Sequence, residues 1–355
     1  MFPARNGLDM SYNYTIAQSP LMGKDIVGAF VTSAKAKSIG HGFYYSSVVN
    51  NFLNVQLGKV RPEPLSDGQV GISDETYDKI VFDQLTELWT EYGALTEIWF
   101  DGGYTGSQRG KIQSLLEQYQ PQAVIIIGCQ EDGTCVSGNS VRWIGTEEGH
   151  APEENWSTGI TNDGGASDSP DFCPSACDTT LQWPKRWFWG ADASIRSLKE
   201  MIDVYHRTVG RNCMLELDLS PGRDGLVTPA HVERYRGLGD FIKTCYGNPV
   251  TPTNVIKECG AGVYAMKFDK PVSIDRIQLM EDQSDGQVIR TYGVYAKLAG
   301  VEQDGWTLVS DGTSVGHKTI DIFDNVIKVD AIKVNSTYVD TPKWRPASVH
   351  LCDQY

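Results

Sequence analysis

The chain has 355 residues, enough for two domains of ordinary size, and its 40% hydrophobic and 21% charged content excludes disordered, collagen-like and coiled-coil proteins. No apolar run approaches the roughly 18 residues of a membrane-spanning helix, so we expect no membrane partner. The balance of 31 Lys and Arg against 45 Asp and Glu gives a net charge of −14, which excludes nucleic acid as the main partner.

From residue 24 to about residue 247, short apolar runs alternate with stretches of helical length. The expected strands are residues 41–46, 97–102, 123–128, 141–147, 186–190 and 212–219. The expected helices are residues 25–37, 74–92, 108–119, 192–209 and 229–246. This alternation predicts a parallel sheet, either doubly wound or closed as a (β/α) barrel. A barrel is favoured because no Gly-rich phosphate fingerprint opens a helix, whereas acidic and aromatic residues follow several strands.

Beyond residue 247 the pattern changes to short alternating runs broken by prolines. The expected strands there are residues 262–268, 274–280, 293–296, 306–310 and 331–334. We therefore predict a catalytic barrel domain over residues 1–247 and an antiparallel β-sandwich over residues 248–355. Cys259 and Cys352 bracket the second domain and could form a disulfide, although the sequence does not determine the pairing.

The cysteine count and the glycosylation sequons favour secretion. The chain has eight cysteines and three Asn-x-Ser/Thr sequons, at Asn13, Asn155 and Asn335. Residues 1–5 carry neither a basic region nor an apolar segment typical of a signal peptide. We expect an extracellular protein whose signal peptide lies upstream of this sequence, with a cytosolic protein as the alternative.

Asp101 is the first candidate for chemistry. It ends an apolar strand, is preceded by Trp99 and Phe100, and is followed by two glycines that allow a sharp turn. A carboxylate at the end of a barrel strand faces the cleft and suits a nucleophile or base. The alternative is an ordinary aspartate that starts a turn.

Glu147 and Glu148 form the second candidate, in the segment WIGTEEG at the end of another expected strand. Two adjacent carboxylates repel each other, which favours the protonated form of one of them, as a general acid requires. The alternative is a pair of solvated loop glutamates.

Together these carboxylates predict glycoside cleavage, in which two carboxyl groups flank the scissile bond. Seven of the nine tryptophans lie between Trp89 and Trp189, and aromatic faces at strand ends pack against sugar rings. We assign Trp89, on an expected helix, to the core. Cys173 and Cys177 lack a partnering Cys/His pair, so a local disulfide or a loop is favoured over zinc, and no metal or cofactor is expected.

The segments GFYYS, EIWFDGGY, WIGTEEG and GRNCMLELDLSPGRDGLV resemble those of the α-L-fucosidases of glycoside hydrolase family 29. The resemblance covers nearly the whole chain and implies a retaining mechanism on a (β/α) barrel followed by a β-sandwich. It implies that Asp101 is the nucleophile and that Trp99 contacts the fucose. Tyr45, or the adjacent Tyr44, matches a tyrosine near the sugar, and Trp187 matches a platform aromatic in a late barrel strand.

The acid/base is implied to be Glu147, with Glu148 in reserve, because WIGTEEG is similar to the segment of the branch that prefers α-1,3 and α-1,4 fucosyl linkages. The implied partner is a fucosylated oligosaccharide or glycoconjugate. The family's barrel begins upstream of this sequence, so we expect a (β/α)8-type TIM barrel lacking its first two strand-helix units. Two other functions remain open: a carbohydrate-binding protein impaired in catalysis, and a different retaining glycosidase.

Overall fold

The computed structural model describes Ile16 and residues 19–62, 64–130, 132–258, 262–301 and 305–352. The chain divides into two compact units, Met1–Arg142 and Trp143–Tyr355, and each has hydrophobic clusters of its own. Within the described ranges no helix is long and apolar enough to cross a membrane.

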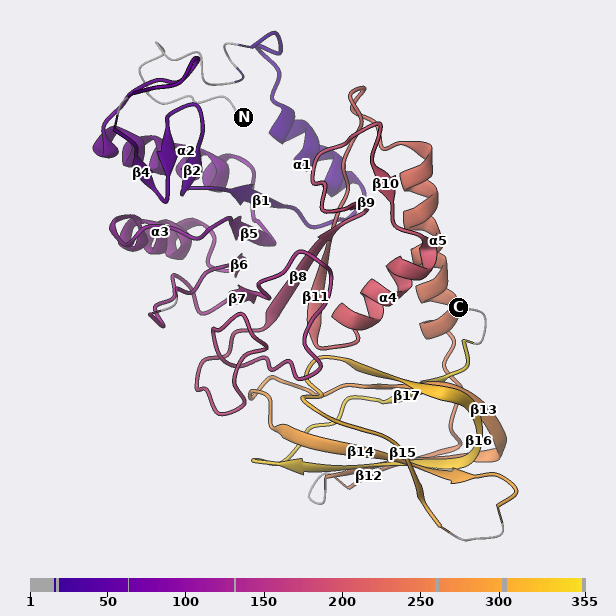
Figure 1. The fold of residues 1–355 in the computed structure, drawn as a ribbon. Helices are drawn as coiled ribbons and strands as arrows, with labels where there is room; N and C mark the ends of the chain where they lie inside the picture. Colours follow the sequence, from indigo (N-terminus) through magenta and orange to yellow (C-terminus); the bar gives the residue numbers. More distant parts are fainter. Residues whose placement is uncertain are drawn as a thin grey trace. The chain divides into compact units, whose positions relative to one another are not determined.

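The first unit is built on parallel strands that follow one another in chain order. β1 (Gly42–Tyr45) pairs with β5 (Glu97–Phe100), β5 with β6 (Val124–Ile126), and β6 with β7 (Ser140–Trp143), at whose end the unit stops. The helices of this unit are α1 (Ile26–Ala36), α2 (Asp74–Glu91) and α3 (Gly106–Tyr119), drawn in indigo and purple in Figure 1. A small antiparallel sheet follows β1, formed by β2 (Val49–Asn50), β3 (Val55–Gln56) and β4 (Lys59–Val60).

Helix α2 shows how local sequence and core packing agree in this unit. Ser73 caps the helix by accepting a hydrogen bond from the amide of Thr76, and acidic residues occupy the first turn. Trp89, near the other end, is 2% exposed and contacts Phe100 of β5 edge to face. The assignment of Trp89 to the core is therefore confirmed.

The second unit begins with another parallel pair. β8 (Ser175–Thr180) lies beside β11 (Cys213–Asp218). A disulfide between Cys177 and Cys213 joins the two strands, although in the register Cys213 is paired with Ser175 and Cys177 with Leu215. Helices α4 (Leu198–Thr208) and α5 (Pro229–Tyr246) pack on each other, and α4 also contacts β11 (Figure 1). A short antiparallel pair, β9 (Gln182–Trp183) and β10 (Ser194–Ile195), lies between β8 and α4 in the chain.

The expected strand over residues 186–190 is wrong, because this segment forms a loop in which Phe188 is exposed. The strand that precedes this loop in the chain is β8. Its sequence SACDTT has little apolar character, although all six residues are buried. Its polar side chains find partners inside the unit, as Thr180 does with the carbonyl of Gln182 at 2.6 Å. The local disulfide considered between Cys173 and Cys177 is also wrong, since Cys177 pairs with Cys213.

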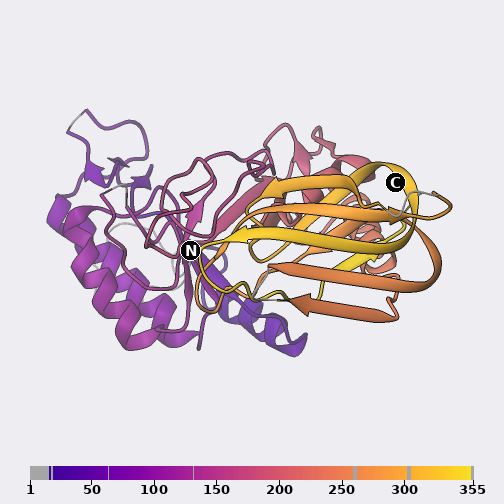
Figure 2. The same ribbon diagram turned by 90° about the horizontal axis from the view of Figure 1, so that it is seen from below.

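The C-terminal strands are antiparallel, as expected, and longer than the sequence runs. They are β12 (Asn254–Glu258), β13 (Val263–Leu279), β14 (Ile289–Leu298), β15 (Thr307–Thr313), β16 (Thr319–Tyr338) and β17 (Ser348–His350). The described strands form one hydrogen-bonded sheet in the order β12-β13-β16-β14-β15, with β17 added to β13. Figure 2 shows the long strands running side by side. The expected strands over residues 262–268 and 274–280 form one long strand, β13. The pairing of β13 with β16 shifts between Lys267 and Val272.

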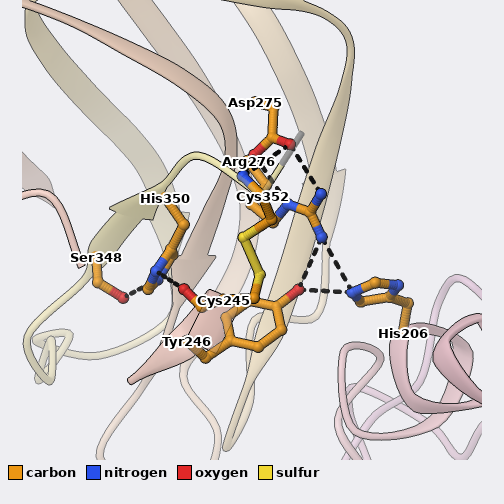
Figure 3. Close-up of a disulfide and its surroundings, with 8 residues drawn as sticks. All are labelled: His206, Cys245, Tyr246, Asp275, Arg276, Ser348, His350 and Cys352. Atoms are coloured by element: carbon orange, nitrogen blue, oxygen red, sulfur yellow. Dashed lines mark hydrogen bonds and ion pairs between the residues drawn. A yellow bond between two sulfur atoms is a disulfide. The ribbon is translucent and has the colours of Figure 1, made fainter. Parts of the chain in front are cut away.

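The link between helix α5 and the C-terminal sheet is a disulfide beside a buried polar cluster (Figure 3). Cys352, after β17, pairs with Cys245 of α5, so the considered pairing of Cys352 with Cys259 is wrong; Cys259 itself lies outside the described residues. The backbone amide of Cys352 donates to the carboxylate of Asp275 at 3.2 Å. The same carboxylate accepts two hydrogen bonds from the Arg276 guanidinium, at 2.9 and 2.8 Å.

Arg276 also faces helices α4 and α5. Its guanidinium lies 3.4 Å from the hydroxyl of Tyr246, and that hydroxyl lies 2.6 Å from Nε2 of His206 (Figure 3). Burial first, and then the Arg276 charge, lower the pKa of His206 to about 4. His206 is therefore neutral near pH 7. Because the Arg276 guanidinium can only donate and lies 3.4 Å from both Nε2 and the Tyr246 hydroxyl, we assign Nε2 as the acceptor of the hydrogen bond that Tyr246 donates.

The disulfide between Cys245 and Cys352 should contribute more to stability than the one between Cys129 and Cys135. The first closes a separation of 107 residues and the second a separation of 6. From loop-closure entropy we expect the double Cys→Ser variant of the first pair to lose about 4–5 kcal/mol of unfolding free energy, and that of the second about 2 kcal/mol. Urea denaturation would measure both losses, and equal losses would contradict the entropic account.

Candidate active site

Asp101 lies directly after β5, in the turn that leads to α3. Its backbone amide donates to the carbonyl of Tyr45 at 3.1 Å, which extends the pairing of β1 with β5 by one residue. The side chain is exposed. Trp99 stands two residues earlier in the strand, so alternation places the Trp99 and Asp101 side chains on the same face of the sheet.

Tyr44 contributes the hydroxyl group that contacts this carboxylate. In the register of β1 with β5, Tyr44 is paired with Trp99, so Tyr44, Trp99 and Asp101 share one face. The Tyr44 hydroxyl donates a hydrogen bond to Oδ2 of Asp101. Partial burial of the hydroxyl end, and then the Asp101 carboxylate, raise the pKa of Tyr44, so the phenol stays protonated and remains a donor.

Tyr45, the first choice from the sequence, points to the opposite face. It is partly buried against the hydrophobic cluster of the first unit, and its hydroxyl donates to Oε1 of Gln84 on α2 at 2.8 Å. Tyr45 therefore helps to hold β1 against α2, and Tyr44 is the tyrosine that reaches the candidate nucleophile. Tyr44 and Tyr45 differ only in the face of β1 from which each side chain projects, and the motif GFYYS does not reveal which tyrosine lies on which face.

Gly102 makes the turn after Asp101 feasible. It adopts a φ of +72°, which is strained for residues with a side chain, and a Cβ at this position would collide with the side chain of Val48. The chain can thus turn away immediately after the carboxylate, which leaves Asp101 at the edge of the sheet instead of in its interior.

Glu147 and Glu148 lie in the second unit, in the turn after β7. Glu147 is half-buried, and its carboxylate makes no hydrogen bond or ion pair with any residue in the described part of the chain. Glu148 is exposed and lies 3.7 Å from the ammonium group of Lys185. Glu147 is therefore the carboxylate that is left available for another group.

The turn that carries these glutamates is held against the end of β8 by Arg196, which the sequence reasoning missed. Its guanidinium donates to the carbonyl of Glu148 at 3.2 Å and to the hydroxyl of Thr179 at 3.0 Å. That hydroxyl donates in turn to the carbonyl of Glu147 at 2.8 Å. Arg196 also lies 4.0 Å above the Trp183 ring. No motif marks Arg196 in the sequence, because its partners are scattered along the chain.

Trp187 is half-buried in the loop after β9 and does not lie in a strand. The buried amide of Gln182 holds this loop, since it contacts the carbonyls of Arg186 and Phe188 at 3.3 and 3.1 Å and accepts from the Gly190 amide at 2.9 Å. The Trp187 ring is thus presented by an ordered loop. Among the described residues no group of three or more His, Cys, Asp or Glu is arranged to hold a metal ion.

Carboxylates and aromatic side chains at the ends of parallel strands, in a chain that continues into an antiparallel sheet, are typical of glycoside hydrolases. Comparison with known proteins identifies the family. The model of the alpha-L-fucosidase family matches residues 9–247, which is more than half of the chain. The protein therefore belongs to the alpha-L-fucosidase family of glycoside hydrolases.

A curated relative, "Alpha-L-fucosidase 1" of Arabidopsis thaliana, is 25% identical over 358 residues, covering 87% of this chain and 65% of the relative. The chain thus spans less than two thirds of that relative's length. A glycoside hydrolase 29 member from a rumen bacterium superposes with a TM-score of 0.78 at 21% identity, covering 100% of this chain and 65% of the other. A Ruminococcus gnavus GH29 fucosidase in complex with fucose gives 0.72 at 19% identity, covering 92% and 75%. The two structures show that the fold is shared.

Proposed function

We propose that this protein is an exo-acting retaining α-L-fucosidase that removes terminal α-linked fucose from glycans. The observation that carries the proposal is the shared face of Tyr44, Trp99 and Asp101, in a chain that belongs to the alpha-L-fucosidase family. An exposed carboxylate held by a phenol and followed by a sharp turn has the accessibility and orientation that a nucleophile requires.

In the first step, a carboxylate oxygen of Asp101 forms a bond to the anomeric carbon while the bond to the leaving oxygen breaks. Glu147 gives its proton to that oxygen. In the second step, Glu147 takes a proton from water, the water oxygen attacks the anomeric carbon, and the ester to Asp101 breaks. Two inversions release fucose with retained configuration. Trp99, Tyr44 and Trp187 are proposed to contact the sugar or its surroundings.

The proposed substrates are fucosylated oligosaccharides or glycoconjugates with α-1,3 or α-1,4 linkages. The similarity of WIGTEEG to the branch that prefers these linkages supports this assignment. A fold relative that was crystallised in complex with fucose supports the sugar itself. We also propose that the parallel strands of this chain belong to a (β/α) barrel, the fold that the family resemblance implies.

We further propose that the protein folds in an extracellular or secretory compartment. Three disulfides join described residues, and the pair Cys177–Cys213 lies between adjacent strands in the interior of the second unit. Such bonds form and persist in oxidising environments and are rare in the cytosol.

Replacing Asp101 tests the proposed function directly. We expect Asp101→Ala to lower kcat for an aryl α-L-fucoside by at least about 1000-fold, because the covalent step is lost. With Asp101→Gly, added azide should restore turnover and yield the β-configured fucosyl azide. A loss within about tenfold for Asp101→Ala would contradict the nucleophile assignment. If the wild-type chain bound fucosylated glycans without any turnover, a carbohydrate-binding function would replace the enzymatic one.

The two glutamates should differ in a test that varies the leaving group. We expect Glu147→Ala to slow the cleavage of natural glycans about 100-fold or more, with a much smaller effect on an aryl fucoside whose leaving group needs no proton. Glu148→Ala is the matched control, and we expect it to stay within about threefold on both substrates because Glu148 contacts Lys185 at the surface. An equal loss on both substrates for Glu147→Ala would point to another acid.

Tyr44→Phe should impair catalysis, whereas Tyr45→Phe should not. Removing the Tyr44 hydroxyl deletes a hydrogen bond to a carboxylate, which predicts a loss of about 10- to 100-fold in kcat/KM. Tyr45→Phe loses the contact with Gln84, which lies on the opposite face of the sheet from Asp101, and we expect a change below about threefold. Equal losses in kcat/KM for the two variants would refute the assignment of Tyr44.

A further inference from the structure

Two of the three glycosylation sequons lie on described residues, and the structure separates them by burial. Asn155 is 1% exposed. Its side-chain nitrogen donates to the hydroxyl of Ser175 at 2.8 Å and to the carbonyls of Arg211 and Asn212 at 2.8 and 3.2 Å. A glycan on this nitrogen would displace all three contacts from the interior of the unit. Asn335 is exposed on β16, and Asn13 lies outside the described residues.

The neighbours of Asn335 across the sheet differ on its two sides. Asn335 is paired with Gly293 of β14 and with Val263 of β13, and paired residues of antiparallel strands point to the same side. Gly293 has no side chain, and the position that its Cβ would take lies against the Tyr295 ring and, at 3.4 Å, against Cδ1 of Leu308. The opposite neighbour, Val263, is half-buried.

An aromatic ring covers Gly293, next to Asn335. Tyr295 follows Gly293 by two residues and shares its face, and a Cβ built on Gly293 would lie 3.0 Å from Cε2 and 3.3 Å from the hydroxyl of Tyr295. The ring therefore leans over Gly293, towards the position beside Asn335. The Lys333 ammonium lies 5.5 Å from the centre of the Tyr295 ring and 4.6 Å from that of Trp306.

We propose that Asn335 is an N-glycosylation site and that the first sugar of its glycan packs against the ring of Tyr295, which covers Gly293. In the reaction, the Asn335 side-chain nitrogen loses a proton and bonds to C1 of the sugar. The C1–oxygen bond to a lipid diphosphate carrier breaks, and the diphosphate leaves. The hydroxyl of Thr337 completes the sequon. The proposal rests on the proposed secretory folding of the chain, and it is independent of the fucosidase reaction.

The packing follows from the shapes of the two groups. The C–H face of a sugar ring is apolar, and an aromatic face is the surface against which it loses least hydration. Gly293 lets the Tyr295 ring lie close to Asn335, whereas a side chain at this position would push the ring aside. Because the linking amide and the sugar are neutral, neither opposes the positive charge of Lys333.

Occupancy of the site is tested on the full chain, expressed in yeast behind a secretion signal. We expect peptide mass spectrometry after enzymatic release of glycans to show conversion of Asn335 to Asp. The glycan should disappear in Asn335→Gln and Thr337→Ala and persist in the conservative variant Thr337→Ser. Asn155 should be unmodified in the folded, secreted protein. A secreted chain with its disulfides formed and Asn335 unmodified would overturn the proposal.

Packing on Tyr295 is tested by thermal unfolding of the chain trimmed to one sugar at Asn335, compared with Asn335→Gln. We expect the glycosylated form to melt about 2 °C higher, and the same difference in a Tyr295→Phe background, which keeps the ring. In a Tyr295→Ala background the difference should vanish. An unchanged difference in Tyr295→Ala would overturn the packing. Neither readout uses hydrolysis, so failure of the proposed enzymatic function would leave both results interpretable.

Discussion

The parallel register between β1 and β5 is the constraint on which the candidate site of the first unit depends. It pairs Tyr44 with Trp99 and Tyr45 with Phe100, so one tyrosine reaches Asp101 and the other reaches the core. A shift by one residue would exchange the two tyrosines and leave the Asp101 carboxylate without its phenol donor. The contact of Tyr45 with Gln84 on α2 and the edge-to-face packing of Phe100 with Trp89 hold β1 and β5 against the helix. Core packing on one face therefore determines the chemistry on the other.

The second unit uses buried polar groups for the same purpose. Arg196 connects the turn of Glu147 and Glu148 to the end of β8, and the Asn155 amide connects β8 to the start of β11. Each of these groups replaces several waters with contacts inside the protein, and removing one would leave its partners unsatisfied. The C-terminal sheet is joined to the same unit by the disulfide between Cys245 and Cys352. In physical terms that sheet is part of the structure that holds α4 and α5 in place.

Much of this fold could be predicted from the sequence where the signals are local. Helix α5 begins and ends at the expected residues, because Pro229 stands in its first turn and apolar residues recur at helical spacing. Asp101 and Trp99 could be assigned to one face because residues two apart in a strand share a face. Strand β8 could not be recognised, because most of its buried polar residues are satisfied by partners far away in the chain, such as Trp143, Glu147 and Asn155. The choice between Tyr44 and Tyr45 required knowledge of which side of β1 faces α2.

The polar cluster beside the Cys245–Cys352 disulfide also ties the stability of the second unit to pH. Arg276, Tyr246 and Asp275 face His206 directly or through one another, and Asp203 acts on it from its own helix. The pKa of His206 is lowered from 6.5 to about 4, so between these values the unfolded chain binds the proton more readily than the folded one. The stabilisation is thus fully present above pH 6.5 and is lost as the pH falls towards 4. Protonation would place a second cation beside Arg276 and remove the acceptor of the Tyr246 hydroxyl. The contacts that hold the C-terminal sheet to α4 and α5 are therefore strongest when His206 is neutral.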